Sequence, residues 1–191
     1  MYFFFDTETG GLRPEHSLLT LSGIIADKDF NIVPVEPGSS GLYLKIKHEQ
    51  YSLTAGALNV NKIDLNEHHS SAVTVRDAQY VLRQFLNRAR DVTGKRRLIP
   101  AGHNVAFDAQ FLKAYLLTEA EWEDFFTYPA FDTAAIARFF NAVGFVQGGY
   151  SLTALRDRFV PDASGQMHNA EIDNLTTIAL ARKFVSMVQR S

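Results

Sequence analysis

The sequence contains no cysteine, so neither a disulfide nor a thiolate metal site can form within its 191 residues. No apolar stretch approaches the roughly 20 residues that a helix needs to cross a bilayer. The chain runs from Met1 through four aromatic residues into Asp6, without the basic leader or small-residue cleavage site of a signal peptide. We therefore expect a soluble, cytoplasmic protein that does not contact a membrane.

A strong excess of one charge is also missing, because the formal net charge is only −2. The hydrophobic fraction of 46% and the charged fraction of 21% are ordinary for a globular protein, and there is no repeat or low-complexity tract. We expect one domain over residues 1–191. The charge neither indicates nor excludes a nucleic-acid enzyme, since carboxylates around metal ions would offset a basic binding surface.

The spacing of apolar residues predicts secondary structure that alternates along the chain. A hairpin-like opening is followed by alternating helices and strands. Strands are expected at 2–6, 18–25, 30–33, 42–46, 98–101 and 128–132. Helices are expected at about 70–89, 106–117, 133–142, 151–159 and 169–188. This order predicts an α/β domain with a mixed central β-sheet flanked by helices.

Four carboxylates in three short segments are candidates for a metal site. Asp6 and Glu8 are two residues apart on a strand, so they leave the same face, where paired negative charges are costly without a cation. Asp108 begins a helix and could simply cap it. Asp173 lies within an apolar helix, where a carboxylate is seldom buried without a partner or an ion. Taken alone, Asp6 and Glu8 could equally be two ordinary acids at a solvated strand end.

His168 precedes Asp173 by five residues. A single histidine is more often a surface or core residue than a base. An imidazole beside a metal-bound carboxylate, however, can accept a proton from water near neutral pH. The combination makes His168 the candidate general base.

The segments DTETGGL, HNVAFD and HNAEID resemble the three motifs of the DEDD exonuclease superfamily. The H-x-A-x-x-D pattern at 168–173 is typical of the histidine subclass, DEDDh, which includes bacterial proofreading exonucleases, ribonuclease T and oligoribonuclease. The motifs occur in the family's order and span residues 6–173. The resemblance implies a ribonuclease H-like fold and a 3′→5′ exonuclease.

The same resemblance assigns roles to the five residues. Asp6, Glu8, Asp108 and Asp173 would hold two Mg²⁺ or Mn²⁺ ions, which suit hard oxygen ligands. His168 would deprotonate the attacking water in a two-metal hydrolysis that releases nucleoside 5′-monophosphates.

The resemblance also implies contacts with the terminal nucleotide. The candidates are Thr7, Thr9, Gly10, Leu12, Asn61, Asn104 and Phe107. Leu12 would wedge against the terminal base, Asn104 would shape the site, and Phe107 would be core or a shelf beside the substrate. Many family members have a hydroxyl residue where this chain has Gly10, so only the backbone N–H of Gly10 is expected to remain available for a contact.

Basic residues between 76 and 97 give a candidate path for nucleic acid. Arg76, Arg83 and Arg90 are spaced by seven and share one helical face, either as a phosphate track or as an ordinary solvated surface. Lys45 and Lys47 form a second, weaker candidate.

Three other histidines are expected to be non-catalytic. His103 has the position of a structural, hydrogen-bonded histidine. The pair His68 and His69 lacks a third ligand at zinc-site spacing, so a solvated surface is expected.

These observations predict a metal-dependent 3′→5′ exonuclease acting on single-stranded 3′ ends, with DNA slightly preferred. The alternative is an exoribonuclease of the same family that trims RNA 3′ ends. A more distant alternative is a non-catalytic module that binds nucleic acid or a polymerase. A homodimer and a polymerase-associated subunit both remain open.

Overall fold

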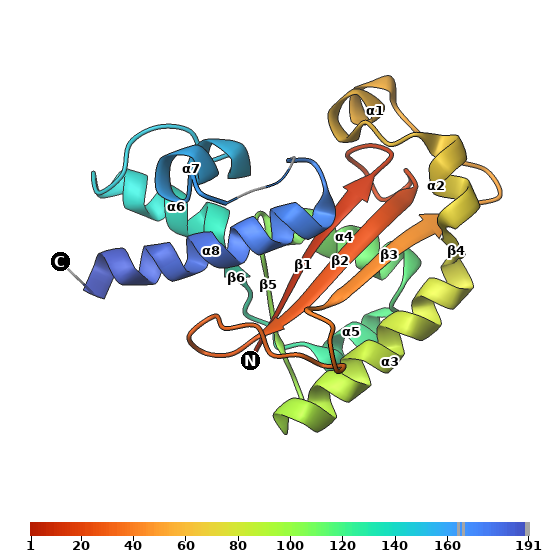
Figure 1. Cartoon of the computed structure of the whole chain (residues 1–191), viewed down its shortest axis with the longest axis horizontal. Helices are drawn as coiled ribbons and strands as arrows, with labels where there is room; N and C mark the ends of the chain where they lie inside the picture. The colour runs from red at the N-terminus through yellow and green to blue at the C-terminus, as the bar shows by residue number, and fades with distance from the viewer. Residues whose placement is uncertain (164, 166, 190–191) are drawn as a thin grey trace.

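The computed structural model describes residues 1–163, 165 and 167–189. Within these residues, one six-stranded sheet has the order β4-β3-β2-β1-β5-β6 (Figure 1). The strands are β1 (Tyr2–Thr9), β2 (Leu18–Ala26), β3 (Leu42–Lys47), β4 (Val73–Thr74), β5 (Ile99–Gly102) and β6 (Phe131–Asp132). β1, β2 and β3 form an antiparallel meander, whereas β5 joins β1, β6 joins β5 and β4 joins β3 in parallel. The predicted mixed sheet is therefore confirmed.

Helices occupy most of the rest of the described chain. They are α1 (Ala55–Asn61), α2 (Leu65–Ser71), α3 (Val75–Thr93), α4 (Val105–Tyr115), α5 (Glu119–Phe125), α6 (Thr133–Ala142), α7 (Leu152–Phe159) and α8 (Ala170–Gln189). Several begin at a residue whose side chain accepts a hydrogen bond from the first turn, as Ser151 does for α7. In the part of the chain that is described, no helix combines the length and the apolar character required for a membrane span.

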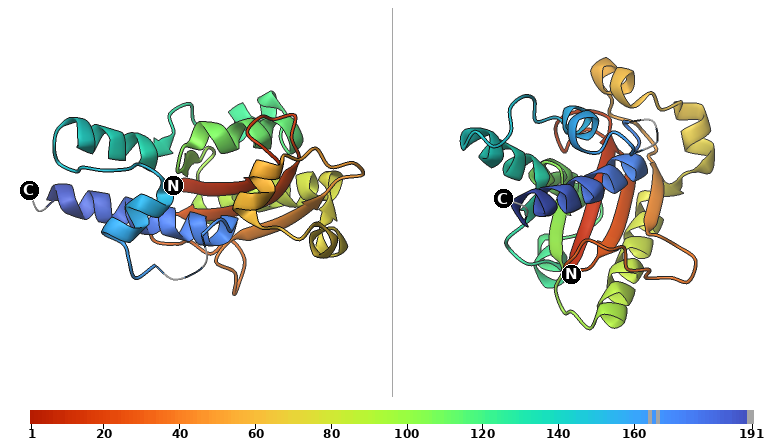
Figure 2. Two further views of the ribbon diagram at one scale, coloured as in Figure 1. Left: turned by 90° about the horizontal axis from the view of Figure 1, so that it is seen from above. Right: turned by 60° about the vertical axis from the view of Figure 1, so that its left-hand side comes forward.

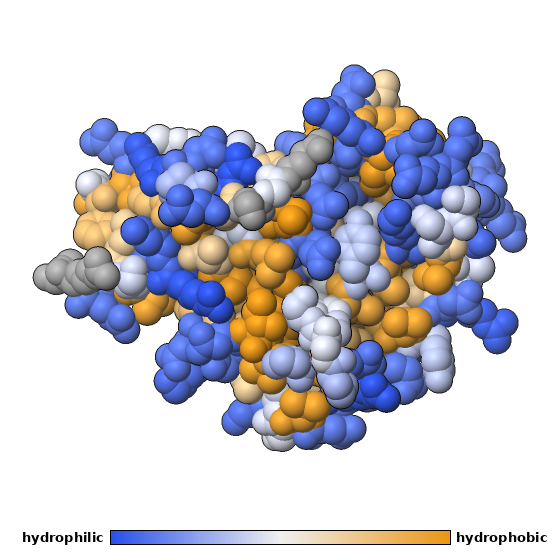
Figure 3. Space-filling view, viewed as in Figure 1, coloured by the Kyte–Doolittle hydropathy of each residue, from blue (hydrophilic) through white to orange (hydrophobic). Residues whose placement is uncertain are grey.

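The sheet lies between two layers of helices (Figure 2). α3, α4 and α5 cover one face, where they bury the larger hydrophobic core together with Phe3 and Phe5 of β1. α8 covers the other face and packs on Phe4 through Ile178 and Ala181. Hydrophobic surface in Figure 3 gathers mainly beside α8. Alternate residues of β1 therefore meet different helices, which decides where its acidic side chains point.

The structure corrects part of the predicted secondary structure. The strand expected at 30–33 does not form, because the chain turns at Phe30 with a left-handed φ of 61° and only Ile32 bridges to Ala26. α1, α2 and α5 were not predicted. The helix expected from residue 70 instead begins at Val75, after the short strand β4.

Candidate active site

β1 presents two carboxylates toward α8. Asp6 and Glu8 follow Phe4 on the same face of the strand, at the end where β1 approaches its loop to β2. The backbone N–H of Glu8 donates to the Thr20 hydroxyl on β2 at 3.3 Å. Glu8 is only 9% exposed, so its position on the strand places a charged group in a poorly solvated environment.

α8 brings a third carboxylate to the same place. Asp173, in the first turn of α8, is buried, and one carboxylate oxygen from each of Asp6, Glu8 and Asp173 lies within 4.8 Å of the others. Among the described residues, nothing donates a hydrogen bond to Asp173 Oδ1, although this atom is buried. A buried carboxylate oxygen without a donor is costly unless a cation supplies the missing interaction.

Asp108 reaches the site from the opposite side of β1. It lies in the first turn of α4, and its Oδ1 accepts hydrogen bonds from the Thr7 backbone N–H at 2.9 Å and the Thr7 hydroxyl at 2.6 Å. Asp108 is buried, and its charge acts on Asp6 and Glu8. Its oxygens lie outside the tight group formed by Asp6, Glu8 and Asp173.

The four carboxylates hold their protons more tightly than isolated acids. Burial raises the pKa of Asp6 well above its usual value, and the charges of the other three add to the effect. Burial, with Asp173 and Asp108, raises the pKa of Glu8 to about 8. Burial raises the pKa of Asp108 to about 7 and that of Asp173 to about 6, although hydrogen bonds from Thr7 and His168, respectively, oppose these two shifts. Mutual repulsion of this kind is relieved when a cation binds.

His168 lies immediately before α8, in an exposed position. Its backbone N–H donates to Asp173 Oδ2 at 3.1 Å, and its φ of 66° is left-handed. The imidazole makes no hydrogen bond to any other described residue, so it remains free to interact with water. The backbone bond ties this histidine to one carboxylate of the acidic group.

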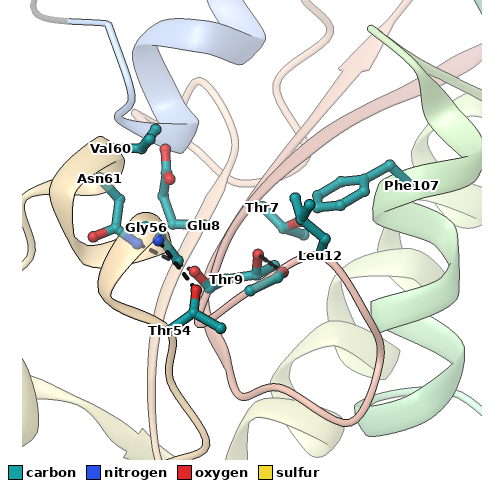
Figure 4. Close-up of a pocket in the computed structure, with 11 residues that line it drawn as sticks. Thr7, Glu8, Thr9, Leu12, Thr54, Gly56, Val60, Asn61 and Phe107 are labelled. Carbon is teal, nitrogen blue, oxygen red and sulfur yellow. Dashed lines mark hydrogen bonds between the residues drawn. The ribbon is translucent and has the colours of Figure 1, made fainter.

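A cavity of about 440 Å³ opens beside Glu8 (Figure 4). Its walls come from the end of β1, the β1–β2 loop, α1 and α4. Leu12 is 80% exposed and lies beside Phe107, across the cavity from Val60 and Asn61. The Asn61 amide donates to the Thr9 carbonyl at 3.2 Å and holds α1 against β1.

The structure brings five of the seven expected substrate contacts to this cavity. They are Thr7, Thr9, Leu12, Asn61 and Phe107. Asn104 lies outside it and precedes α4 in a left-handed conformation, with its backbone N–H donating to Asp132 at 3.0 Å.

The expectation for Gly10 was wrong. Its backbone N–H is not available, because it donates to the Ser17 carbonyl at 2.7 Å. A Cβ at position 10 would lie only 2.3 Å from the Ser52 carbonyl oxygen. The close approach of the segment before α1 explains why this chain has glycine where many family members have a hydroxyl residue.

Sequence reasoning missed the contribution of α1 to the cavity. The additional lining residues are Gly11, Thr54, Gly56, Ala57 and Val60. Thr54 caps α1 through its side chain and also donates its backbone N–H to the Gly10 carbonyl. A threonine followed by a short apolar segment is a weak helix-start signal, and it was the only local indication of α1.

Two of the three arginines of the expected nucleic-acid track pair with acids of α5. Arg83 forms two hydrogen bonds with Glu121, at 2.6 and 3.2 Å, and Arg90 pairs with Asp124 at 2.9 Å. These two arginines therefore join α3 to α5, and neither belongs to an open track or a freely solvated face. Arg76 remains exposed.

The histidine predictions had different outcomes. His103 is hydrogen-bonded as expected, to the Thr133 hydroxyl and the Tyr150 carbonyl, each at 2.9 Å. The solvated surface expected for His68 was wrong: it is 3% exposed and contacts the Ile46 carbonyl at 2.9 Å. His69 is exposed and contacts the Tyr51 hydroxyl.

The side chains of the acidic group fit hard divalent cations. All potential ligands are carboxylate oxygens, the donors that Mg²⁺ and Mn²⁺ prefer. The partnerless, buried Asp173 Oδ1 is the observation that demands such an ion most directly. Asp6, Glu8 and Asp173 can share one cation, and Asp108 stands nearby on the other side of β1.

The overall fold is shared with solved structures. The fold matches Escherichia coli exonuclease I in complex with a dA16 oligonucleotide, with a TM-score of 0.75 and 19% identity over 99% of this chain and 41% of that chain. It also matches exonuclease I from Methylocaldum szegediense, with a TM-score of 0.70 and 20% identity over 100% of this chain and 41% of that chain. This chain thus spans about two fifths of the length of those solved proteins. No match was found among curated proteins.

The family itself is shown by sequence. The RNase T exonuclease model matches residues 3–181, which include all three acidic motifs, nearly the whole described sheet and the first part of α8. The chain therefore belongs to this exonuclease family.

Proposed function

We propose that this protein is a metal-dependent exonuclease that removes nucleoside 5′-monophosphates from single-stranded 3′ ends, with DNA slightly preferred. One observation carries the proposal: three carboxylates from β1 and α8 converge within 4.8 Å, with one buried oxygen left without a donor, beside a cavity of about 440 Å³. The family match supports the exonuclease chemistry.

Asp6, Glu8, Asp108 and Asp173 hold two Mg²⁺ or Mn²⁺ ions in this proposal. Ions bound there would supply a Lewis acid for the phosphate and a stabilising charge for the leaving 3′-oxygen. The protein's own part is to fix the ligands before substrate arrives. Thr7 does this for Asp108 through two hydrogen bonds, and the His168 backbone does it for Asp173.

His168 acts as the general base. Its imidazole is exposed, so a water molecule can reach it, and its backbone is fixed to Asp173. In the proposed step, the imidazole takes a proton from the attacking water. The new P–O bond forms as the bond to the leaving 3′-oxygen breaks.

The cavity beside Glu8 receives the terminal nucleotide. Leu12 and Phe107 give it an apolar side on which a base can stack, and Asn61 gives it a polar side. The exposed Leu12 beside Phe107 offers an apolar surface to the flat face of a base.

DNA is the preferred substrate in the proposal because the solved relatives were captured with dA16 and dT13 oligonucleotides. Trimming of RNA 3′ ends is the alternative, since no described contact is specific for a 2′-hydroxyl. Matched DNA and RNA single strands of one sequence distinguish the two by their kcat/KM values.

The proposal is tested with oligonucleotides labelled at either end, incubated with Mg²⁺ or with EDTA. A 3′ label should be released at once as a mononucleotide, and a 5′ label should give a ladder of shortening products. Asp173→Asn should abolish both, whereas Asp91→Asn, which removes an exposed carboxylate of α3, should not. Binding without degradation, under every metal tried, would instead favour the non-catalytic module.

A further inference from the structure

A second cavity lies away from the acidic group, where β3 ends beside α2 and α3 begins. It measures about 620 Å³, and its lining includes Lys47, His48, His69 and Arg76. The elements that form it lie together at one edge of the molecule (Figure 1), and this edge is mostly hydrophilic (Figure 3). We call it the cationic hollow.

Sheet pairing brings the two cations of the hollow together, although they are far apart in sequence. β3 and β4 pair in parallel with Lys47 opposite Thr74. α3 starts at Val75, which places Arg76 just beyond this register. Arg76 of α3 and Lys47 of β3 therefore line the same hollow.

These cations differ from the other basic residues of α3. Arg83, Arg88 and Arg90 are each paired with an acid, namely Glu121, Glu36 and Asp124. Within the described chain, Lys47 and Arg76 form no ion pair. Two acids also face this region: Glu49 is exposed in the lining, and Asp77 is hydrogen-bonded to the Thr74 hydroxyl at 2.7 Å.

The segment 48–54, hydrogen-bonded to Ser17 and Leu18, connects the cationic hollow to the cavity beside Glu8. The His48 ring contacts the Leu18 carbonyl at 2.8 Å, and the Ser52 N–H donates to the Ser17 hydroxyl at 2.9 Å. Thr54, at the far end, lines the cavity. The segment from residue 48 to residue 54 spans at most about 20 Å.

We propose that the cationic hollow binds the phosphodiester backbone of the same strand, upstream of the 3′ end held beside Glu8. This inference rests on the proposed function. Lys47 and Arg76 contact phosphate without reading sequence. Because phosphates of a DNA strand follow one another at ~3.4 Å or more along its axis, a strand of about six nucleotides reaches both sites.

The test compares dT2 with dT12, because only the longer strand reaches the hollow. Binding of each labelled oligonucleotide is measured in EDTA, and KM is measured with Mg²⁺. For Lys47→Gln with Arg76→Gln, the Kd for dT12 should rise about tenfold in 50 mM salt, and the Kd for dT2 less than twofold. The slope of log K against log salt should become shallower by about 0.7 for each phosphate that the variant no longer neutralises.

Lys95→Gln with Arg97→Gln removes the same charge at the other end of α3, roughly 27 Å away along the helix. This control should leave both affinities unchanged. Equal weakening by the two double variants, or equal effects on dT2 and dT12, would overturn the proposal. Equal Tm values of the variants and wild type would exclude a folding defect. A wild-type protein that binds dT12 through the hollow but degrades nothing would refute the proposed function alone.

Discussion

The two faces of β1 show how one strand serves two purposes. Phe3, Phe5 and Thr7 point toward α3, α4 and α5, where apolar packing is extensive. On the other face, Phe4 packs on α8, and the next two side chains that β1 presents to this face are those of Asp6 and Glu8. Because side chains alternate along a strand, a single residue step separates core from site.

The two faces differ in whether their charged side chains form ion pairs. Three arginines of α3 form ion pairs, as Arg83 does with Glu121, although the buried Nε of Arg90 has no partner among the described residues. The acidic group on the α8 face forms no ion pair with a described side chain and leaves Asp173 Oδ1 without a donor. The first face stabilises the fold. On the second face, the carboxylates repel one another, and bound cations would relieve this repulsion.

The largest effect is expected for Glu8→Gln, which should separate activity from stability. Turnover with Mg²⁺ should fall about 10³-fold, since metal ligands support several kcal/mol of transition-state stabilisation. In EDTA the variant should be more stable than wild type at pH 8. In wild type the pKa of Glu8 is raised to about 8, so ionising this side chain is unfavourable in the folded protein. The free energy of unfolding of wild type therefore falls as pH rises from about 4.5 through 8.

Thermal unfolding of both proteins in EDTA, from pH 5 to pH 9, measures this second effect. The variant should show a flatter decline of Tm over that range. A variant that loses both activity and metal-free stability would mean that Glu8 is a structural residue.

His168→Ala should lower turnover ~10²–10⁴-fold, as loss of a general base does. Mn²⁺ affinity, measured calorimetrically, should change little, because His168 contacts the acidic group through its backbone N–H, which alanine retains. Gln147→Ala, at an exposed residue that lines neither cavity, is the control and should keep wild-type turnover. A fall in Mn²⁺ affinity as large as the fall in turnover would make His168 a metal ligand.

The sequence was sufficient for those features that depend on local pattern. Aromatic and β-branched residues identified β1 and β2, and apolar residues on most sides of 169–188 identified a buried α8. Asp6 and Glu8 were placed on one face by strand alternation alone. The roles of the site residues came from motif resemblance, since spacing does not reveal that residues 8 and 173 meet.

Other features depend on contacts that local pattern cannot encode. Arg83 looked free because its partner, Glu121, is 38 residues away on an unpredicted helix. The T-x-x-E sequence at 118–121 does form a capping box and was an overlooked signal for α5. The crowding around Gly10 was not predictable, because it results from the return of residues 52–54 to the β1–β2 loop, where the Thr54 N–H donates to the Gly10 carbonyl.

On the apolar face, Phe3→Ala should destabilise the protein by about 3–5 kcal/mol. Phe3 is fully buried, and its ring stacks on Phe5 and Phe126 with centroids 5.4 and 5.5 Å apart. Urea unfolding measures the loss. Phe139→Ala, at a position 62% exposed, is the control and should cost little. Specific activity of the folded fraction should survive in Phe3→Ala, the reverse of the result expected for Glu8→Gln.

The smallest effect concerns the ion pair of the same face and has the opposite pH dependence. Hydrogen bonds from Arg83 hold the pKa of Glu121 at about 2, below its ordinary 4.5. The pair therefore stabilises the fold above pH 4.5, and this contribution disappears as pH falls toward 2. Since both side chains are about a third exposed, we expect only about 1 kcal/mol. Urea unfolding of wild type and Glu121→Gln between pH 6 and pH 2.5 should show two curves that converge in acid. Parallel curves would mean that Glu121 contributes through the helix cap rather than through its charge.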